Sequence, residues 1–407
     1  MGGVSMEWKE VDICQLCDSV SETYKGNASE VVLINTSDVL DGKCLNHEYV
    51  PNKKLKGQFK KTFRKGDILY SEIRPANKRF CFVDFEPKDY IASTKLMVLR
   101  AHEDVDPQYL YQILRSNDTL AQLQMLAESR SGTFPQITYS ELSNIMVSLP
   151  SQKAQKNIVS ILSSLDRKIE LNNKINADLE EMAQAIFKNW FVDFEPFKDG
   201  KFVDSELGMI PEGWKVGRLD EIADVVGGST PSKAKPEYYT QKGIAWLTPK
   251  DLSNHPAVYT SRGEIDITEE GYNSTSTKLM PKGTILFTSR APIGYISIAQ
   301  NDICTNQGFK SLVPKKAGTC FLYCFLKYVT PEIENKSTGS TFKEASGSLM
   351  KSLQVIMPEQ KVFEDFETVV SPLFARIESL EKENSRLSLL RDTLLPRLMS
   401  GELEVPE

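Results

Sequence analysis

The sequence predicts an α+β protein in which two globular α+β domains, in a pseudo-twofold arrangement, are separated by two long helices that form an antiparallel coiled coil. Two observations lead to this prediction. The chain contains one sequence unit twice, in the same order. Each copy changes from short β-branched and aromatic runs to heptad spacing directly after a proline, Pro150 or Pro358. The 407 residues leave room for two to four domains of roughly 100 to 200 residues each.

The repeat consists of ordered matches along the whole chain. The pair Trp8-Lys9 recurs as Trp214-Lys215, and KGDILYS at 65–71 recurs as KGTILFT at 282–288. Toward the end of each copy the offset between matching residues is constant at 208. The matches there are Thr133-Phe134 with Thr341-Phe342, Leu149-Pro150 with Met357-Pro358, and Gln152-Lys153 with Gln360-Lys361. One match alone would carry little weight, but the shared order indicates a duplication.

The two copies divide the chain into six segments. We expect a first globular domain over 1–150, a first long helix over 151–195, a linker over 196–210, a second domain over 211–358, a second long helix over 359–400 and a tail over 401–407. Within the domains, β-branched and aromatic runs broken by turn residues predict strands at Val31–Ile34, Asp67–Tyr70 and Ile285–Phe287. The stretch Pro107–Glu128 has a helical pattern.

The helical segments are too long to stand alone. Apolar residues repeat at heptad spacing over 158–190 and 366–394, and Arg391 alone lies outside the pattern. A helix from about 152 to 190 spans roughly 58 Å, far more than one small domain needs. Such a helix must pack on another helix, and its own repeat is the obvious partner.

Polar residues in the heptads give two further expectations. Asn176 and Asn384 occupy equivalent seam positions, where a buried Asn would fix the register at a cost in stability. The alternative is two solvated surface residues. Pro372 lies inside the second helical segment and should kink that helix or delay its start.

Composition excludes several classes of protein. Apolar residues make up 40% of the chain and charged residues 26%, and no apolar run approaches the roughly 18 residues of a membrane span. The first residues, MGGVSMEWKE, lack a basic segment followed by an apolar core, so no secretory signal is expected. Seven scattered cysteines suit a reducing compartment better than a disulfide framework. We therefore expect a cytoplasmic protein without a membrane partner.

The repeat suggests a function in reading two sites. Two similar domains held apart by antiparallel helices suit two half-sites on double-stranded DNA, and diverged copies imply an asymmetric, bipartite target. A formal charge of −6 gives no support from the chain as a whole, so the support must be local. One local run has no acidic residue inside it, although a solvated loop would look the same. It consists of Lys53, Lys54, Lys56, Lys60, Lys61, Arg64 and Lys65.

Motifs for catalysis and metal binding do not stand out. The sequence lacks a phosphate-binding G-x-x-x-x-G-K-[ST] loop, a G-x-G-x-x-G turn and H-E-x-x-H. Cys14, Cys17, Cys44 and His47 have spacings that resemble a zinc set. The second copy has Asp220 and Ala223 where the first has Cys14 and Cys17, so the unit folds without these ligands and we expect no metal.

Several motifs together resemble one family, the specificity subunit of Type I restriction-modification enzymes, over nearly the whole chain. They are MIPEGW at 209–214, GSTP at 228–231, IAWLTPKDL at 244–252, FKNWFVDFEPF at 187–197 and LLPRLMSGE at 394–402. Any one of them is weak, and their order together with the duplication makes the resemblance strong. The first domain departs from the pattern, with SETY at 21–24 where the second has GSTP.

The resemblance implies a protein that reads DNA and catalyses nothing. Each domain would be a target recognition domain for half of a split sequence. The coiled coil would measure the unread spacer and dock two methyltransferase subunits, which would carry S-adenosylmethionine and methylate adenine. Restriction subunits would add ATP-driven translocation and magnesium-dependent cutting, so this subunit would hold no cofactor, in a prokaryotic cytoplasm.

Candidate site residues follow from the loops and from local charge. DNA-binding candidates in the first domain are Lys60, Lys61, Arg64, Arg74, Lys78, Arg79, Lys95, Arg130, Ser131, Thr133 and Gln136. Those in the second are Lys250, Lys278, Arg290, Gln307, Lys310, Thr338, Ser340, Thr341 and Lys343. Excess aromatic surface at the end of the first helix suggests a partner-binding set of Ile186, Phe187, Trp190, Phe191 and Phe194. A local cap under residues 196–210 would explain the same residues.

Two other functions remain open from the sequence. A single-chain enzyme acting on DNA, a methyltransferase or nuclease with an unreadable motif, would consume S-adenosylmethionine or cut DNA by itself. A helical scaffold whose domains bind protein would show no salt-dependent affinity for DNA.

Overall fold

The computed structural model describes residues 8–53, 57–129, 135–290, 292–338, 343–403 and 405. The chain forms two compact units. The first unit comprises 1–168 and 386–407, and the second unit comprises 169–385. Each unit therefore contains one copy of the repeated domain and parts of both long helices. Among the described residues, no helix is both long and apolar enough to cross a membrane.

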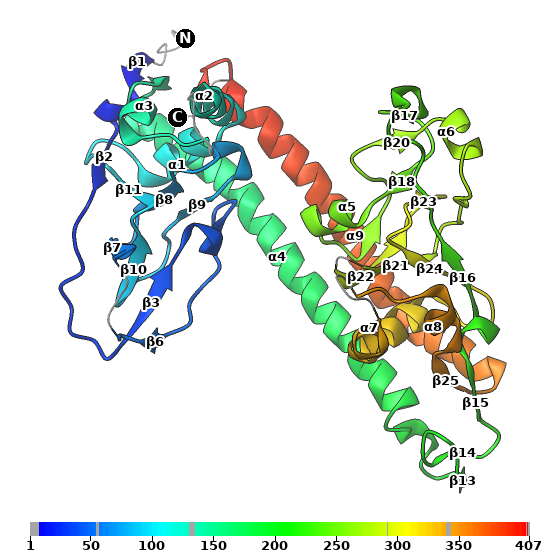
Figure 1. The fold of residues 1–407 in the computed structure, drawn as a ribbon. Coiled ribbons are helices and arrows are strands. Elements are labelled where there is room, and N and C mark those ends of the chain that lie inside the picture. Colours follow the sequence, from blue (N-terminus) through cyan, green and yellow to red (C-terminus); the bar gives the residue numbers. More distant parts are fainter. Residues whose placement is uncertain are drawn as a thin grey trace, which may run out of the picture. The chain divides into compact units, whose positions relative to one another are not determined.

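The two long helices are present as expected. Helix α4 runs over Gln152–Phe191 and helix α9 over Gln360–Met399, each 40 residues long (Figure 1). The expectation that Pro372 delays the start of the second helix is wrong, because α9 begins twelve residues earlier. An interior proline removes one backbone hydrogen bond. The buried side chains of Phe366, Val370 and Phe374 hold the turns around it against the domain.

The first unit contains two four-stranded sheets and two strand pairs among its described residues. The sheet orders are β2-β11-β8-β9 and β6-β3-β10-β7, and β1 pairs with β12 and β4 with β5. The strands are β1 (Lys9–Asp12), β2 (Cys17–Val20), β3 (Glu30–Ile34), β4 (Val39–Leu40), β5 (Lys43–Cys44), β6 (Val50–Pro51), β7 (Phe59–Lys61), β8 (Ile68–Ser71), β9 (Phe80–Phe82), β10 (Tyr90–Ser93), β11 (Leu96–Ala101) and β12 (Met146–Leu149). Strands β3 and β8 confirm the two strands expected in this domain.

The helical stretch expected over 107–128 is two helices rather than one. Helix α1 covers Pro107–Arg115 and α2 covers Asn117–Glu128. Ser116 separates them with an extended backbone (ψ 146°), and its hydroxyl accepts a hydrogen bond from the amide of Thr119 at 3.2 Å. Ser116 is therefore the N-cap of α2, and its extended backbone interrupts what would otherwise be one continuous helix. A short helix α3 (Tyr139–Ser143) follows and leads into β12.

The second unit repeats this framework with a larger main sheet. Among the described residues, five strands form the order β16-β24-β21-β22-β19, and four strand pairs surround them: β13-β14, β15-β25, β17-β20 and β18-β23. The strands are β13 (Phe202–Val203), β14 (Ile210–Pro211), β15 (Lys215–Arg218), β16 (Ala223–Gly227), β17 (Tyr239–Thr240), β18 (Trp246–Leu247), β19 (Tyr259–Thr260), β20 (Asp266–Ile267), β21 (Ile285–Ser289), β22 (Ile293–Ala299), β23 (Cys304–Thr305), β24 (Lys310–Pro314) and β25 (Gln354–Met357). The helices are α5 (Pro249–Asn254), α6 (Glu269–Asn273), α7 (Thr319–Lys336) and α8 (Gly347–Ser352).

The matches of the repeat fall on equivalent structural positions. In both units the strand after the repeated Trp-Lys pair runs antiparallel to the strand that precedes a long helix, as β1·β12 and β15·β25. The Lys-Gly pair before β8 and before β21 needs a left-handed glycine, with φ of 90° at Gly66 and 85° at Gly283. Asn35 with Asp38 and Thr248 with Asp251 form equivalent capping boxes. The duplicated residues are thus mainly those that fix turns and helix starts.

Each long helix packs against the other within each unit. In the first unit Ile158 and Leu162 of α4 share a core with Leu395 and Leu398 of α9. In the second unit the end of α4, with Ala183 and Phe187, shares a core with the start of α9, with residues 366–377. The beginning of one helix therefore packs against the end of the other, so the pair is antiparallel, as expected.

Asparagine side chains lie in the contact between the two long helices. Asn172, fully buried, donates from Nδ2 to Oδ1 of Asn384 at 2.9 Å, and Asn384 donates to Asn173 at 2.8 Å. Asn176 is also buried, but its Oδ1 has no hydrogen-bond partner in the described part of the chain. Asn176 is thus buried at the expected seam position rather than solvated, and Asn384 is partly buried. In an antiparallel pair, equivalent residues move in opposite directions along the seam and do not face each other.

The residue outside the heptad pattern takes part in an ion-pair cluster of the first unit. Arg391 of α9 contacts Asp166 of α4 at 2.8 Å, and Arg115 of α1 contacts the same carboxylate at 2.9 Å. The two guanidinium side chains are only 17% and 11% exposed. One carboxylate thus joins the first domain to both long helices.

Replacing Asp166 with Ala tests this cluster. We expect the free energy of unfolding to fall by about 2 kcal/mol, because two largely buried cations lose their shared carboxylate. Urea unfolding monitored by circular dichroism measures the change. The control is Asp392→Ala, whose carboxylate is half exposed and contacts only the outer side of Arg391, with an expected loss below about 0.5 kcal/mol. Equal losses in both variants would contradict the assigned role.

Candidate nucleic-acid interface

Three charged side chains of the second unit meet at one place. Arg290 follows strand β21, Lys310 begins β24, and Glu344 lies shortly before α8. The carboxylate of Glu344 is 3.6 Å from Nη1 of Arg290 and 3.4 Å from Nζ of Lys310. An antiparallel bridge between Arg290 and Glu344 holds the two backbones together. Two predicted site residues, Arg290 and Lys310, therefore contact one acidic residue that the sequence did not single out.

The cluster of Arg290, Lys310 and Glu344 lies at the base of the predicted DNA-facing loop of the second domain, residues 337–343. Thr338 and Glu344 form an antiparallel bridge, with the amide of Glu344 donating to the carbonyl of Thr338 at 3.0 Å. Lys343 is exposed beside Glu344 and reaches the carbonyl of Glu334 at 3.4 Å. The predicted residues Ser340 and Thr341 lie outside the described residues. The structure therefore places the base of this loop at the Arg290 cluster.

The GSTP turn lies against the strand end that carries Gln307. The amide of Ser229 donates to the carbonyl of Thr305 at 2.9 Å, and a Cβ on Gly228 would be only 2.2 Å from that carbonyl oxygen. Only glycine allows so close a backbone approach. The hydroxyl of Thr230 donates to the side chain of exposed Gln307. The motif thus supports a predicted site residue through the backbone.

Two predicted lysines of the second unit do not join the Glu344 cluster by any contact in the described part of the chain. Lys250, on α5, contacts Glu264 at 3.3 Å and lines a polar cavity of about 640 Å³ with Tyr259, Arg262 and Ser385. Lys278 is exposed after α6. Both remain candidates for contacts with phosphate only.

Strand β19, which borders the cavity of Lys250, is held by a carboxylate of the long helix α9. Glu381 accepts hydrogen bonds from the amides of Val258 at 2.7 Å and Tyr259 at 3.0 Å. Burial raises the pKa of Glu381 to about 7 from its usual 4.5, and the two amides lower it by less than burial raises it. Glu381 therefore changes charge near neutral pH.

The first unit brings three of its predicted residues together in the same framework. Gln136 forms an antiparallel bridge with Ile73, and the amide of the next residue, Arg74, donates to the carbonyl of Pro135 at 3.0 Å. The backbone carbonyl of Lys95 accepts a hydrogen bond from the amide of Glu72 at 3.1 Å, and Nζ of Lys95 is 3.8 Å from the carboxylate of Glu72. The neighbouring candidates Arg130, Ser131 and Thr133 lie outside the described residues.

Two predicted cations of the first unit instead stabilise the domain itself. Lys61 donates from Nζ to the carbonyls of Leu96 at 2.8 Å and Thr94 at 3.3 Å, and burial lowers the pKa of Lys61. Arg79 donates to the carbonyl of Ser37 at 3.0 Å. These bonds direct both charged groups at the chain's own backbone, and a role of Lys61 and Arg79 in DNA contact stays a prediction.

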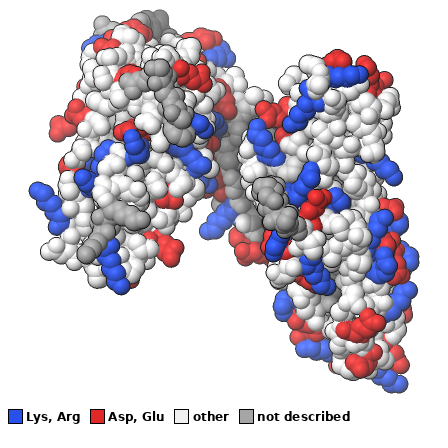
Figure 2. All heavy atoms as spheres, in the orientation of Figure 1, with Lys and Arg blue, Asp and Glu red and all other residues white. Residues whose placement is uncertain are grey.

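The remaining cations of the first unit are on the surface. Lys60 on β7, Arg64 and Lys78 are exposed, and Lys78 adopts a left-handed backbone (φ 52°). On the face drawn in Figure 2, lysine and arginine side chains are interspersed with aspartate and glutamate. Electrostatic attraction to DNA would therefore come from local groups, as the acidic net charge already required.

The aromatic residues at the end of α4 mainly form the core of the second unit, and a partner-binding role of this set stays a prediction. Phe187 and Phe191 are only 2% and 4% exposed, and Phe191 contacts Phe321 with ring centroids 4.9 Å apart. Phe194 contacts Trp214, the Trp of the second copy. The local explanation accounts for these rings, and Ile186 and Trp190 are partly buried in the same core.

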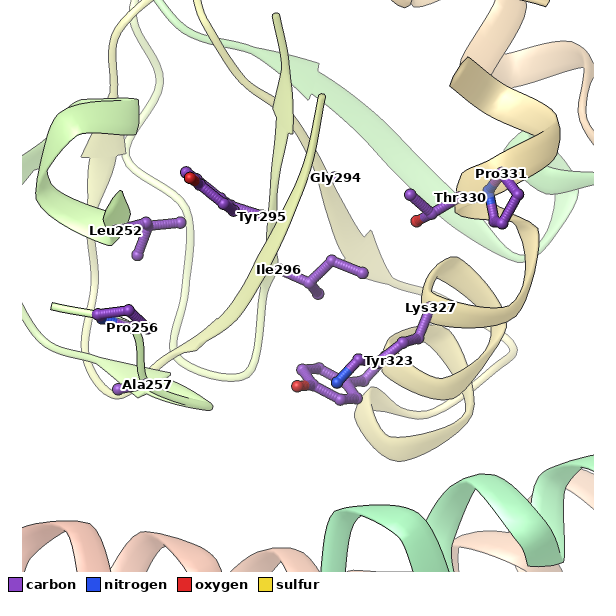
Figure 3. A pocket seen from close by; sticks show the side chains of 10 residues that line it. All are labelled: Leu252, Pro256, Ala257, Gly294, Tyr295, Ile296, Tyr323, Lys327, Thr330 and Pro331. Carbon is purple, nitrogen blue, oxygen red and sulfur yellow. The ribbon is translucent and has the colours of Figure 1, made fainter. Parts of the chain in front are cut away.

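A cleft of about 340 Å³ lies between β22 and α7. Lys327 is the charged residue in its lining, and its ammonium pairs with Glu180. Figure 3 shows Tyr295 and Ile296 on the strand side and Tyr323 and Lys327 on the helix side. The hydroxyl of Tyr323 and the ammonium of Lys327 both contact Glu180 of α4. These polar groups fasten α7 to the long helix.

The cysteines and histidine with zinc-like spacing have other contacts. Cys17 is buried and donates to the carbonyl of Ile13, whereas Cys14 is exposed. His47 contacts the hydroxyl of Tyr90 at 2.9 Å through Nδ1. In the described part of the chain, no three His, Cys, Asp or Glu side chains are grouped so that they could hold a metal ion.

Comparison with known proteins identifies the family. The model of the Type I restriction modification DNA specificity domain matches twice, over residues 6–181 and 211–387. The chain belongs to this family of specificity subunits. It is 33% identical to the Type I restriction enzyme HindI specificity subunit of Haemophilus influenzae, over 98% of this chain and 100% of that protein. It is 42% identical to the MjaIX specificity subunit of Methanocaldococcus jannaschii, over 46% of this chain and 44% of that protein.

A solved structure agrees with the fold. The Type I restriction-modification S subunit from M. genitalium covers 98% of both chains with a TM-score of 0.55 and 18% identity. The expected family and the non-catalytic role are confirmed, because the relatives are specificity subunits. The alternative of a single-chain enzyme is not supported.

Sequence reasoning missed two residues of this specificity subunit. Glu344 has no donor for phosphate and was not among the predicted residues, although a carboxylate also recognises base amino groups. Its position, directly after a loop of the repeat that aligns with Gln136, was the available signal. Glu381 lies on a helix among other acids, and nothing in the sequence marks its burial.

The raised pKa of Glu381 predicts a pH-dependent stability. The folded state binds the proton more tightly than the unfolded state, so this residue's contribution is fully present below about pH 4.5 and is lost as pH rises through about 7. We expect Glu381→Gln to remove this dependence. Between pH 5 and pH 8 the variant should gain stability relative to the wild type by on the order of 2 kcal/mol, measured by urea unfolding. A parallel pH dependence in both proteins would contradict the assignment.

Proposed function

We propose that this specificity subunit reads an asymmetric, bipartite sequence on double-stranded DNA, one half with each domain, and docks two methyltransferase subunits through its long helices. One observation carries the proposal. The two domains have the same backbone framework around the base of their predicted loops but different side chains at equivalent positions. Ile73 and Gln136 in the first domain correspond to Arg290 and Glu344 in the second. Equal frameworks with unequal side chains suit two unequal half-sites.

The exposed cations supply contacts that position the domains without selecting sequence. In this proposal, two groups of surface residues contact phosphate. The first-domain group is Lys60, Arg64, Arg74, Lys78 and Lys95, and the second-domain group is Lys250, Lys278 and Lys343. Arg290 and Lys310, which are partly buried, would approach DNA beside Glu344. The loop residues Arg130, Ser131, Thr133, Thr338, Ser340 and Thr341, together with Gln136 and Gln307, would face base edges.

Each long helix carries an apolar stripe suited to docking a partner. In the second unit the stripe consists of Leu179, Met182 and Ile186, and Met182 is 52% exposed. The equivalent residues of the first unit, 208 positions later, are Leu387, Leu390 and Leu394, and Leu390 is 46% exposed. The same apolar stripe in both copies suits two copies of one partner, whose helices would bury it.

The proposed division of labour assigns cofactors to the partners. S-adenosylmethionine would be bound by the methyltransferase subunits, and ATP and magnesium by the restriction subunits that translocate and cut DNA. In this scheme the subunit contributes recognition and assembly in a prokaryotic cytoplasm.

Salt dependence tests the phosphate contacts. Replacing Lys60 or Lys278 with Ala should reduce the slope of log affinity against log salt by about 0.9 each, because one fewer counterion is released. Fluorescence anisotropy of the assembled methyltransferase on a duplex target, measured across a salt series, gives the slope. Lys336→Ala, which removes the ammonium paired with Glu332 on α7, should leave it unchanged. An unchanged slope in the first two variants would remove these residues from the interface.

Acidic substitutions test the docking stripe. Met182→Glu and Leu390→Glu each place a charge on one stripe, so each should reduce the methyltransferase content of the purified complex from two copies to one. Native mass spectrometry measures the stoichiometry. Ala177→Glu and Ser385→Glu are matched controls, because they introduce the same acid at exposed, mutually equivalent positions on another face of each helix. Two bound copies in all four variants would contradict docking at the stripes.

A further inference from the structure

Glu344 is an accessible carboxylate at the base of a predicted DNA-facing loop. Its side chain is 39% exposed and contacts the side chains of Arg290, which is 36% exposed, and Lys310, which is 17% exposed. The bridges to Arg290 on one side and Thr338 on the other fix its backbone. A base edge could therefore approach the carboxylate without rearrangement of the sheet.

Gln136 occupies the same position in the first domain. It bridges to Ile73 as Glu344 bridges to Arg290. The residues that follow make the same bond, since the amide of Ile137 donates to the carbonyl of Glu72 at 2.8 Å and that of Ala345 to Ser289 at 2.9 Å. The two side chains therefore start from equivalent points of one framework.

The framework does not require an acid at this position. The first domain forms the same bridge with an amide side chain at 136 and an isoleucine opposite it. Ion pairs as exposed as those of Glu344 and Arg290 contribute little to stability. The retained difference between the two copies therefore points to a ligand that differs between them.

The two side chains select different base pairs by their hydrogen-bonding groups. An ionised carboxylate only accepts and matches the N4 amino group of cytosine, while a neighbouring guanidinium donates to O6 and N7 of guanine. A glutamine amide both donates and accepts, and matches N7 and N6 of adenine. Glu344 beside Arg290 thus suits a C·G pair, and Gln136 suits an A·T pair.

We propose that positions 136 and 344 are the equivalent base-selecting positions of the two domains, with Gln136 reading an A·T pair in one half-site and Glu344, together with Arg290, reading a C·G pair in the other. This inference rests on the proposed function, because it assumes that each domain reads half of a split target. Arg290 then has two roles, holding the carboxylate in the free protein and contacting guanine in the complex.

Exchange of the two side-chain types tests the inference. The variants Glu344→Gln and Gln136→Glu, each co-expressed with the methyltransferase subunit of the same system, are compared with the wild type by mapping methylated adenines in genomic DNA. We expect Glu344→Gln to lower the preference for C·G at one position of one half-site by about 5- to 150-fold and to leave the other half unchanged. Gln136→Glu should change one position of the opposite half.

The controls make the same chemical change elsewhere. Glu332→Gln and Gln122→Glu lie on exposed faces of α7 and α2 and should leave the motif unchanged. A half-site without any G·C pair, or variants that methylate the wild-type motif, would overturn the inference. If Glu344→Gln abolishes methylation, loss of binding to one half-site at an unchanged melting temperature supports it, and a lowered melting temperature overturns it. An unsplit motif in the wild type would instead overturn the proposed function.

Discussion

The antiparallel contact between the two long helices is the interaction on which the rest of the structure depends. A forty-residue amphipathic helix has an apolar stripe longer than any small domain can cover, so each helix needs the other. The hydrophobic core of each compact unit contains residues from both helices and from one domain. Each domain also has a smaller cluster of its own, which contains no residue of either long helix. Polar anchors such as Glu180 and Glu381 then fasten the second domain to the helices.

The duplication preserved the residues that fix the backbone and let the exposed side chains diverge. Gly66 and Gly283 keep the left-handed turn before β8 and before β21. Both copies also keep a capping box, which directly follows β3 in the first domain and β18 in the second. Each of these positions has a steric or hydrogen-bonding requirement that few residues meet. Gln136 and Glu344 have no such requirement. A framework of this kind allows recognition to change in one domain without loss of the fold.

Prediction from the sequence succeeded where a periodic pattern or a turn residue determines the structure. The heptads gave both long helices, and β-branched runs gave β3, β8 and β21. Prediction failed where the structure depends on the direction in which a side chain points. A cation in a basic run, such as Lys61, does not reveal that its charged group donates to carbonyls of its own domain. The hydrogen bond between Asn172 and Asn384 was not predicted, because sequence equivalence does not specify which residues of the two helices face each other.

The cluster of Arg115, Asp166 and Arg391 also affects which sequences can pair. The repeat places Phe374 and Ala183 at the positions equivalent to Asp166 and Arg391. Two copies of the first half joined to each other would set Asp166 opposite an alanine, and two copies of the second half would set Arg391 opposite a phenylalanine. Either combination would leave a poorly solvated charge without its helical counterpart. The ion-pair cluster therefore discriminates against self-association of each half and favours the union of the two different halves.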